Sequence, residues 1–190
     1  MKWSFICASW MTIALAHTGF AQRSESQPNK ALLFGAGVSV PVLGAQDLRT
    51  AFYLAYQWTK PEKRLTINHI PLKLVLEADL GFSYGGGWRS RPRDKSWSIS
   101  AMAAARYEKI GPSGRGFFFE GGMGIFMATR RTWDLSSNLN STPTAGGGWI
   151  FPGDGRVYQV GLRLYHISNA GTRRPNQGQN QLLMMAGVRF

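Results

Sequence analysis

The sequence predicts an all-β protein, an eight-stranded antiparallel transmembrane β-barrel of the bacterial outer membrane. Three observations lead to this prediction. The chain begins with an export signal, apolar side chains then recur at every second position, and the last alternating segment closes on Phe190. A strand produces a period of two because successive side chains point to opposite faces of a sheet.

The first 21 residues have the pattern of a secretory signal peptide. Lys2 supplies a positive start, an apolar segment follows, and Gly19 and Ala21 supply small residues before a cut after Ala21. A buried N-terminal helix is the alternative. The single cysteine, Cys7, lies inside this segment, so residues 22–190 are expected to form one barrel domain without a disulfide.

The clearest alternation covers residues 70–84, where charged or small residues lie between apolar ones. The apolar set is Ile70, Leu72, Leu74, Leu76, Ala78, Leu80, Phe82 and Tyr84. Further segments of this kind are 97–108, 158–165 and 182–190, with strand-like runs near 32–40, 48–59, 116–128 and 143–151. Several exceed the roughly 9–11 tilted residues that a strand needs to cross a bilayer.

The polar faces of these segments carry charges of both signs. They are Lys73, Arg106, Arg163 and Arg189, with Glu77, Asp79, Glu108 and Glu120. In a narrow barrel these charges can pair in the lumen while apolar side chains meet lipid. The aromatic residues near strand ends fit a membrane-interface girdle: Trp58, Tyr84, Trp97, Tyr107 and Tyr158. A secreted lipocalin-like barrel or a β-sandwich is the alternative.

The connections alternate in length, as in outer-membrane barrels with short periplasmic turns and long outer loops. The inner turns are expected at 60–64, 111–114 and 152–155. The outer loops carry the arginines Arg89, Arg91, Arg93, Arg130, Arg131, Arg173 and Arg174. The basic residues therefore gather at the end that is expected to face the cell exterior.

The formal net charge of +12 favours a polyanionic partner. For an exported chain we expect lipopolysaccharide of the outer leaflet rather than nucleic acid, with Arg89 and Arg91 binding lipid A phosphates. Ordinary solvated loops are the alternative, and a homodimer is left open. Since no Cys and His cluster has metal-ligand spacing, no metal and no other cofactor is expected.

Three polar residues continue the apolar face of the last two segments. Stepping by two from Leu164 reaches His166 and Ser168, and stepping back by two from Leu182 reaches Asn180. Because neighbouring strands are antiparallel, the three side chains should project outward together at the outer end of the barrel. Histidine is the usual base for a serine nucleophile, and a third group can fix the imidazole tautomer.

The attacked ester would develop an oxyanion, which needs hydrogen-bond donors. Asn169, Gly171 and Asn176 lie in the adjoining loop and are the candidates. The alternative is that the histidine belongs to the interface girdle and that Gly and Asn only shape turns.

The segment His166-Ile167-Ser168-Asn169-Ala170-Gly171, followed by Pro175-Asn176-Gln177-Gly178, resembles the signature of the outer-membrane lipid A 3-O-deacylase family, the PagL-like proteins. The close match covers about 25 residues, together with the terminal strand. The resemblance implies an eight-stranded barrel and a serine esterase without a metal. It would remove the ester-linked 3-hydroxyacyl chain from the 3-position of lipid A.

In the resemblance Ser168 is the nucleophile, His166 the base, and Asn169, Gly171 and Asn176 the oxyanion region. One position departs from the family, because Asn180 stands where the resemblance implies a catalytic glutamate. Glu77 and Asp79 are expected in the lumen and cannot replace it. A non-catalytic barrel that binds lipopolysaccharide is therefore the alternative, and the sequence does not exclude acyl transfer to an acceptor other than water.

Overall fold

The computed structural model describes residues 28–40, 48–85, 94–132, 134–174 and 176–190. The predicted signal peptide, residues 1–21, and the loop arginines Arg89, Arg91 and Arg93 lie outside these ranges. No helix in the described ranges is long and apolar enough to cross a membrane.

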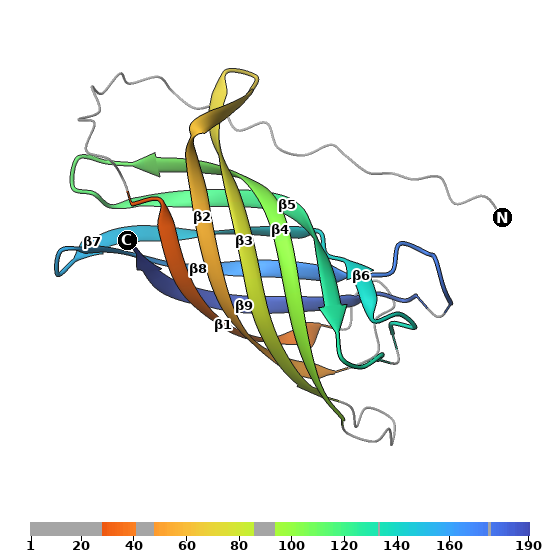
Figure 1. Ribbon diagram of the computed structural model, residues 1–190. Helices are drawn as coiled ribbons and strands as arrows, with labels where there is room; N and C mark the ends of the chain where they lie inside the picture. Colours follow the sequence, from red (N-terminus) through yellow and green to blue (C-terminus); the bar gives the residue numbers. More distant parts are fainter. Residues whose placement is uncertain (1–27, 41–47, 86–93, 133, 175) are drawn as a thin grey trace.

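The described residues form one closed antiparallel sheet (Figure 1). Its strands are β1 Lys30–Val40, β2 Arg49–Ile67, β3 Ile70–Gly85, β4 Asp94–Ile110, β5 Gly116–Ala128, β6 Leu139–Ser141, β7 Thr144–Gly153, β8 Arg156–Ile167 and β9 Gln179–Arg189. Strands β2 to β6 each pair with the preceding strand, β7 pairs with β5 and β8, and β8 pairs with β9. Strand β9 pairs in turn with β1, which closes the sheet.

The nine strands build an eight-stranded barrel, because β6 and β7 occupy one position in it. Both pair with β5, β6 through Ile125–Met127 and β7 through Gly116–Gly122. The interruption falls at Thr142 and Pro143, and proline lacks the N–H that a sheet ladder requires. The predicted fold class is confirmed.

The first predicted inner turn, at 60–64, is wrong. Strand β2 continues to Ile67 across a bulge between Lys60 and Arg64, and the turn consists of Asn68 and His69, both at positive φ. The charged run after Lys60 ends the alternation in the sequence, which hides the rest of the strand. The turns predicted at 111–114 and 152–155 are confirmed.

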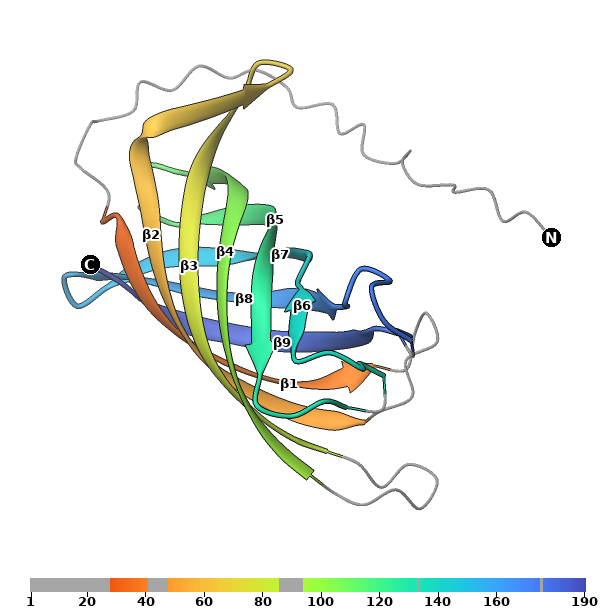
Figure 2. The same ribbon diagram turned by 45° about the vertical axis from the view of Figure 1, so that its right-hand side comes forward.

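The β2–β3 hairpin extends beyond its neighbours, as Figures 1 and 2 show. Pairing of β1 with β2 ends at Trp58, and pairing of β4 with β3 ends at Lys73. The hairpin lies at the end of the barrel that holds the short turns, which we call the turn end. The opposite end, where the connections after β1, β3, β5 and β8 lie, is called the loop end.

The outer wall of the barrel is apolar over most of its height. The exposed side chains include Leu32, Phe34, Leu54, Leu80, Ile99, Ile125, Leu162 and Met184. Exposed aromatic residues lie toward both ends, with Trp97 at the loop end and Trp58 at the turn end. A continuous apolar band with aromatic borders is what the hydrocarbon of a bilayer requires.

The lumen holds the charges that the sequence predicted to pair. Glu120 accepts hydrogen bonds from Arg106 Nε at 2.8 Å and from Arg163 Nε at 3.0 Å. Arg163 also reaches across to Glu77 on β3, and Arg189 on β9 bonds Glu108 on β4. These contacts join opposite walls of the barrel.

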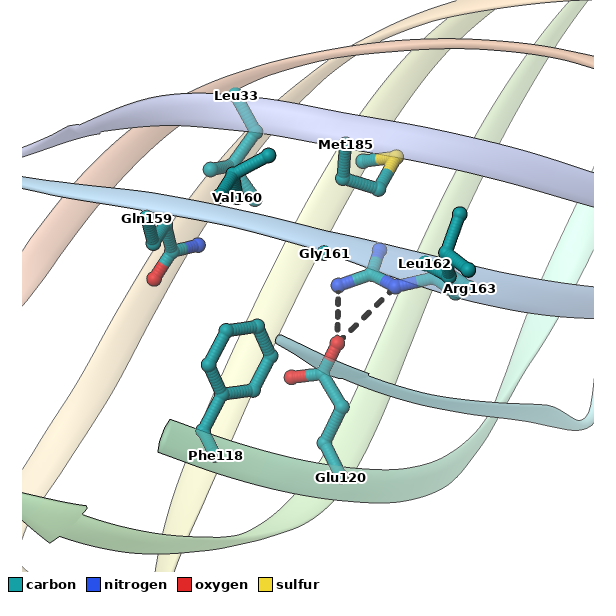
Figure 3. A pocket seen from close by; sticks show the side chains of 9 residues that line it. All are labelled: Leu33, Phe118, Glu120, Gln159, Val160, Gly161, Leu162, Arg163 and Met185. Atoms are coloured by element: carbon teal, nitrogen blue, oxygen red, sulfur yellow. Dashed lines mark hydrogen bonds and ion pairs between the residues drawn. The ribbon is translucent and has the colours of Figure 1, made fainter. Parts of the chain in front are cut away.

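A small cavity of about 10 Å³ lies beside the Arg163–Glu120 pair, between Phe118, Leu33 and Met185 (Figure 3). A cavity of this size holds roughly one water molecule. Around this cavity the described lumen is filled by side chains.

Candidate active site

His166 and Asn180 face each other across the β8–β9 pair at the loop end. They are directly opposite in the strand register, and His166 Nδ1 lies 2.8 Å from Asn180 Oδ1. Tyr165 and Ile167, on either side of His166, point into the lumen and are 1% and 0% exposed. His166 therefore projects from the outer wall, in line with the exposed Leu164.

The contact with Asn180 selects one imidazole tautomer. An asparagine Oδ1 can only accept, so Nδ1 carries the hydrogen and donates it. Nε2 then holds the lone pair of the neutral ring and is the basic nitrogen. Asn180 is 2% exposed, so water does not compete effectively for its amide oxygen.

Gly178 packs against the same imidazole, and its role was not part of the sequence-based site. A Cβ atom at this position would lie 2.7 Å from His166 Cε1, and the backbone of Gly178 has a φ of +75°. Both observations exclude a larger side chain. In the sequence, the signal for this packing role was the glycine that ends the Pro175-Asn176-Gln177-Gly178 stretch.

Ser168 follows the end of β8 and is held there by backbone bonds. Its N–H donates to the Ser141 carbonyl at 3.0 Å, and its carbonyl accepts from the Ser141 N–H at 2.7 Å and hydroxyl at 3.0 Å. His166 N–H donates to the Pro143 carbonyl at 2.9 Å. The β6–β7 interruption thus supplies the backbone that positions both residues.

Ser168 is half-buried as a residue, and among the described residues its hydroxyl makes no hydrogen bond with His166. Both side chains belong to the outward face by the alternation of β8. In free enzymes a catalytic hydrogen bond is often long and tightens only when substrate is bound.

The loop after Ser168 is stabilised by Asn169, which is 3% exposed. Its amide nitrogen donates to Ser136 Oγ at 3.1 Å and to the Arg173 carbonyl at 2.9 Å, and its amide oxygen accepts from Gly171 N–H at 3.0 Å. Its own N–H donates to Asn176 Oδ1 at 3.0 Å. Asn169, Gly171 and Asn176, the predicted oxyanion residues, are therefore neighbours.

These three residues differ in what they can offer a substrate. The side-chain donors of Asn169 and the N–H of Gly171 are engaged within the loop. The amide nitrogen of Asn176 makes no hydrogen bond with another described residue, while its oxygen is fixed by Asn169. The sequence could not show this difference, because it depends on the folded path of the loop.

The carboxylates predicted to be lumenal are lumenal. Glu77 and Asp79 are 5% exposed, and they bond Arg163 and Ser100. Neither points toward the outer wall where His166 lies. Arg89 and Arg91, expected to bind lipid A, lie outside the described residues.

Two solved structures were found to be similar to this chain, and the first of them has the same fold. The crystal structure of the outer membrane enzyme PagL matches with a TM-score of 0.65 and 23% identity, over 84% of this chain and 99% of that chain. The backbone structure of the Yersinia pestis outer membrane protein Ail in a phospholipid bilayer nanodisc matches with a TM-score of 0.43 and 13% identity, over 85% and 99%.

No curated protein sequence matches this chain significantly. The family model for lipid A 3-O-deacylase (PagL) matches residues 49–189, which include seven of the eight barrel positions and both His166 and Ser168. The chain therefore belongs to the lipid A 3-O-deacylase (PagL) family and is an eight-stranded β-barrel protein of the bacterial outer membrane.

Proposed function

We propose that this protein is a serine esterase that hydrolyses the ester-linked 3-hydroxyacyl chain at the 3-position of lipid A. Family membership supports the reaction. The observation that carries the mechanism is the hydrogen bond between His166 and Asn180 on the outer wall at the loop end. There the imidazole meets the outer leaflet, where ester bonds of lipid A lie at the boundary between headgroup and acyl chains.

In the proposed reaction, His166 Nε2 takes the proton of the Ser168 hydroxyl as Oγ attacks the ester carbonyl. The oxyanion is bound by the region of Asn169, Gly171 and Asn176. The Asn176 amide offers a donor at once, whereas Asn169 and Gly171 have to exchange a loop bond for one with the substrate. The sugar oxygen leaves with the proton from His166, and water then releases the 3-hydroxy fatty acid from Ser168.

Asn180 performs one of the two tasks of a triad acid. Its carbonyl orients the ring and keeps the lone pair on Nε2. It has no charge to stabilise the imidazolium that forms during attack. The reaction should therefore be slower than in an enzyme with glutamate at this position.

The test is mass spectrometry of lipid A after incubation of refolded protein with lipopolysaccharide. Wild type is expected to remove one 3-hydroxyacyl chain and to release it as a free acid. Transfer to an acceptor would instead yield an acylated product. An unchanged lipid A mass with wild type at high enzyme concentration would refute the proposal.

Asn180→Glu is expected to raise the deacylation rate on the order of 10- to 100-fold, because the carboxylate stabilises the imidazolium. The variant Asn180→Gln is the matched control, since glutamine has the length of glutamate without its charge. A gain with both variants would contradict the electrostatic explanation and indicate that side-chain length matters.

Gly178→Ala is expected to lower the deacylation rate by about 100-fold, since displacement of a catalytic group by about 1 Å has an effect of that size. The methyl group would press on His166 Cε1 and move the ring away from Asn180. Gly155→Ala is the control, because Gly155 also has a positive φ, +70°, but no atom within 4 Å of the added Cβ. Equal activity of the two variants would contradict the packing role.

A non-catalytic barrel that binds lipopolysaccharide is the second candidate. It is favoured by the neutral Asn180 and by the lack of a hydrogen bond between the Ser168 hydroxyl and His166 among the described residues. It predicts binding of lipopolysaccharide with no change in lipid A mass for wild type or any Ser168 variant. The mass measurement above distinguishes the two candidates directly.

A further inference from the structure

A polar hollow of about 420 Å³ lies in the loop between β8 and β9, next to the proposed active site. It is lined by Gly171, Arg173, Arg174, Asn176 and Gln177, and we call it the arginine hollow. We propose that the arginine hollow binds the phosphate at the 1-position of lipid A, on the sugar whose 3-position carries the ester. This inference rests on the proposed function and specifies how the substrate is recognised.

The charge of the hollow fits a phosphate. Arg173 and Arg174 are exposed, and neither makes an ion pair with a carboxylate in the described part of the chain. The remaining side chains of the lining are the amides of Asn176 and Gln177. Guanidinium groups bind phosphate oxygens through paired N–H bonds, and the amides add neutral donors.

The backbone that carries the arginines is fixed before any ligand binds. The Arg173 carbonyl accepts from Asn169 Nδ2 at 2.9 Å, and Thr172 bonds the Asn169 carbonyl through its N–H and its hydroxyl. Gln177 N–H donates to the Asp134 carbonyl at 3.1 Å, which ties the far side of the loop to the β5–β6 connection. Preorganisation of this kind lowers the entropy cost of binding.

The position of the hollow selects one of the two phosphates of lipid A. Asn176 lines the hollow, and its Oδ1 accepts from the N–H of Asn169, the residue next to Ser168. One hydrogen bond therefore connects the lining of the hollow to the residue that follows Ser168. Positions 1 and 3 of one sugar ring are separated by a single ring carbon, whereas the other phosphate is carried by the second sugar.

The same loop thus has two functions in this proposal. The side chain of Asn169 donates to the Arg173 carbonyl, and the backbone N–H of Asn169 donates to Asn176 Oδ1. The arginine hollow and the oxyanion region are therefore both stabilised by Asn169. A bound phosphate would place the 3-O-ester over Ser168. Discrimination between phosphorylated and dephosphorylated lipid A then follows from the loop alone.

The experiment measures binding to the Ser168→Ala protein in detergent micelles, where the substrate stays intact. Three ligands are compared: lipid A with both phosphates, lipid A lacking the 1-phosphate, and lipid A lacking the phosphate on the second sugar. Loss of the 1-phosphate is expected to weaken binding by about tenfold or more, the size of one charge-assisted contact. Loss of the other phosphate should have a much smaller effect.

The double substitution Arg173→Gln and Arg174→Gln is expected to abolish this difference. The matched control is Arg115→Gln with Arg156→Gln, two exposed arginines at the turn end, where Arg115 precedes β5 and Arg156 begins β8. This control removes the same charge and should leave the difference between the ligands unchanged. Equal binding of all three ligands would overturn the proposal. The same holds if removal of the second-sugar phosphate weakens binding more than removal of the 1-phosphate. If wild type is inactive but this selectivity persists, the proposed function fails and the phosphate site stands.

Discussion

Ser168→Ala is expected to reduce the release of 3-hydroxy fatty acid from lipid A on the order of 10³-fold or more. Without the hydroxyl no acyl-enzyme can form, and only weak catalysis by the oxyanion donors is left. The loss should be smaller than in a complete Ser-His-acid enzyme, because wild type already lacks the acid at Asn180. Rates are measured from the mass-resolved ratio of shortened to full-length lipid A.

Ser113→Ala is the matched control, since Ser113 lies exposed in the turn between β4 and β5 at the opposite end of the barrel. The folded fraction of each variant is checked by the faster gel migration of unheated barrels. A folded Ser168→Ala protein with wild-type rates would show that His166 activates water directly, and the covalent mechanism would be abandoned.

The outward direction of the His166 side chain could be predicted from the sequence because a strand has a fixed period of two. Counting from Leu164 was sufficient to place His166 outside, and the register then set Asn180 opposite it. The same rule predicted the lumenal charges. It failed after Lys60, where a charged run interrupts the alternation although the strand continues to Ile67.

Other features depend on contacts that no pattern contains. The bond from Asn169 to Ser136 and the bridge between Ser141 and Ser168 join segments far apart in the chain. The bridge arises because the sheet is interrupted between β6 and β7 at Pro143, which leaves backbone groups there to pair with the end of β8. Spacing alone therefore identified the loop residues but not which of their donors remain available.

The barrel interior leads to the second large prediction. Glu120→Leu is expected to lower the free energy of unfolding by about 3–5 kcal/mol, the cost of leaving buried charges without their partner. Glu120 bonds Arg106 through one carboxylate oxygen and Arg163 through the other. Both arginines are at most 4% exposed, so water cannot replace the lost acceptor. The measurement is reversible urea unfolding in lipid vesicles, followed by tryptophan fluorescence.

Glu120→Gln should be less destabilising than Glu120→Leu, because the amide oxygen can still accept a bond from one arginine. Asp154→Asn is the control for charge, since Asp154 is exposed in the β7–β8 turn and asparagine tolerates its positive φ of 50°. Equal stability of Glu120→Leu and wild type would mean that Glu77, which already bonds Arg163, can take over both arginines. The lumenal contacts would then be interchangeable, and the position of β8, which carries His166, would not depend on any one of them.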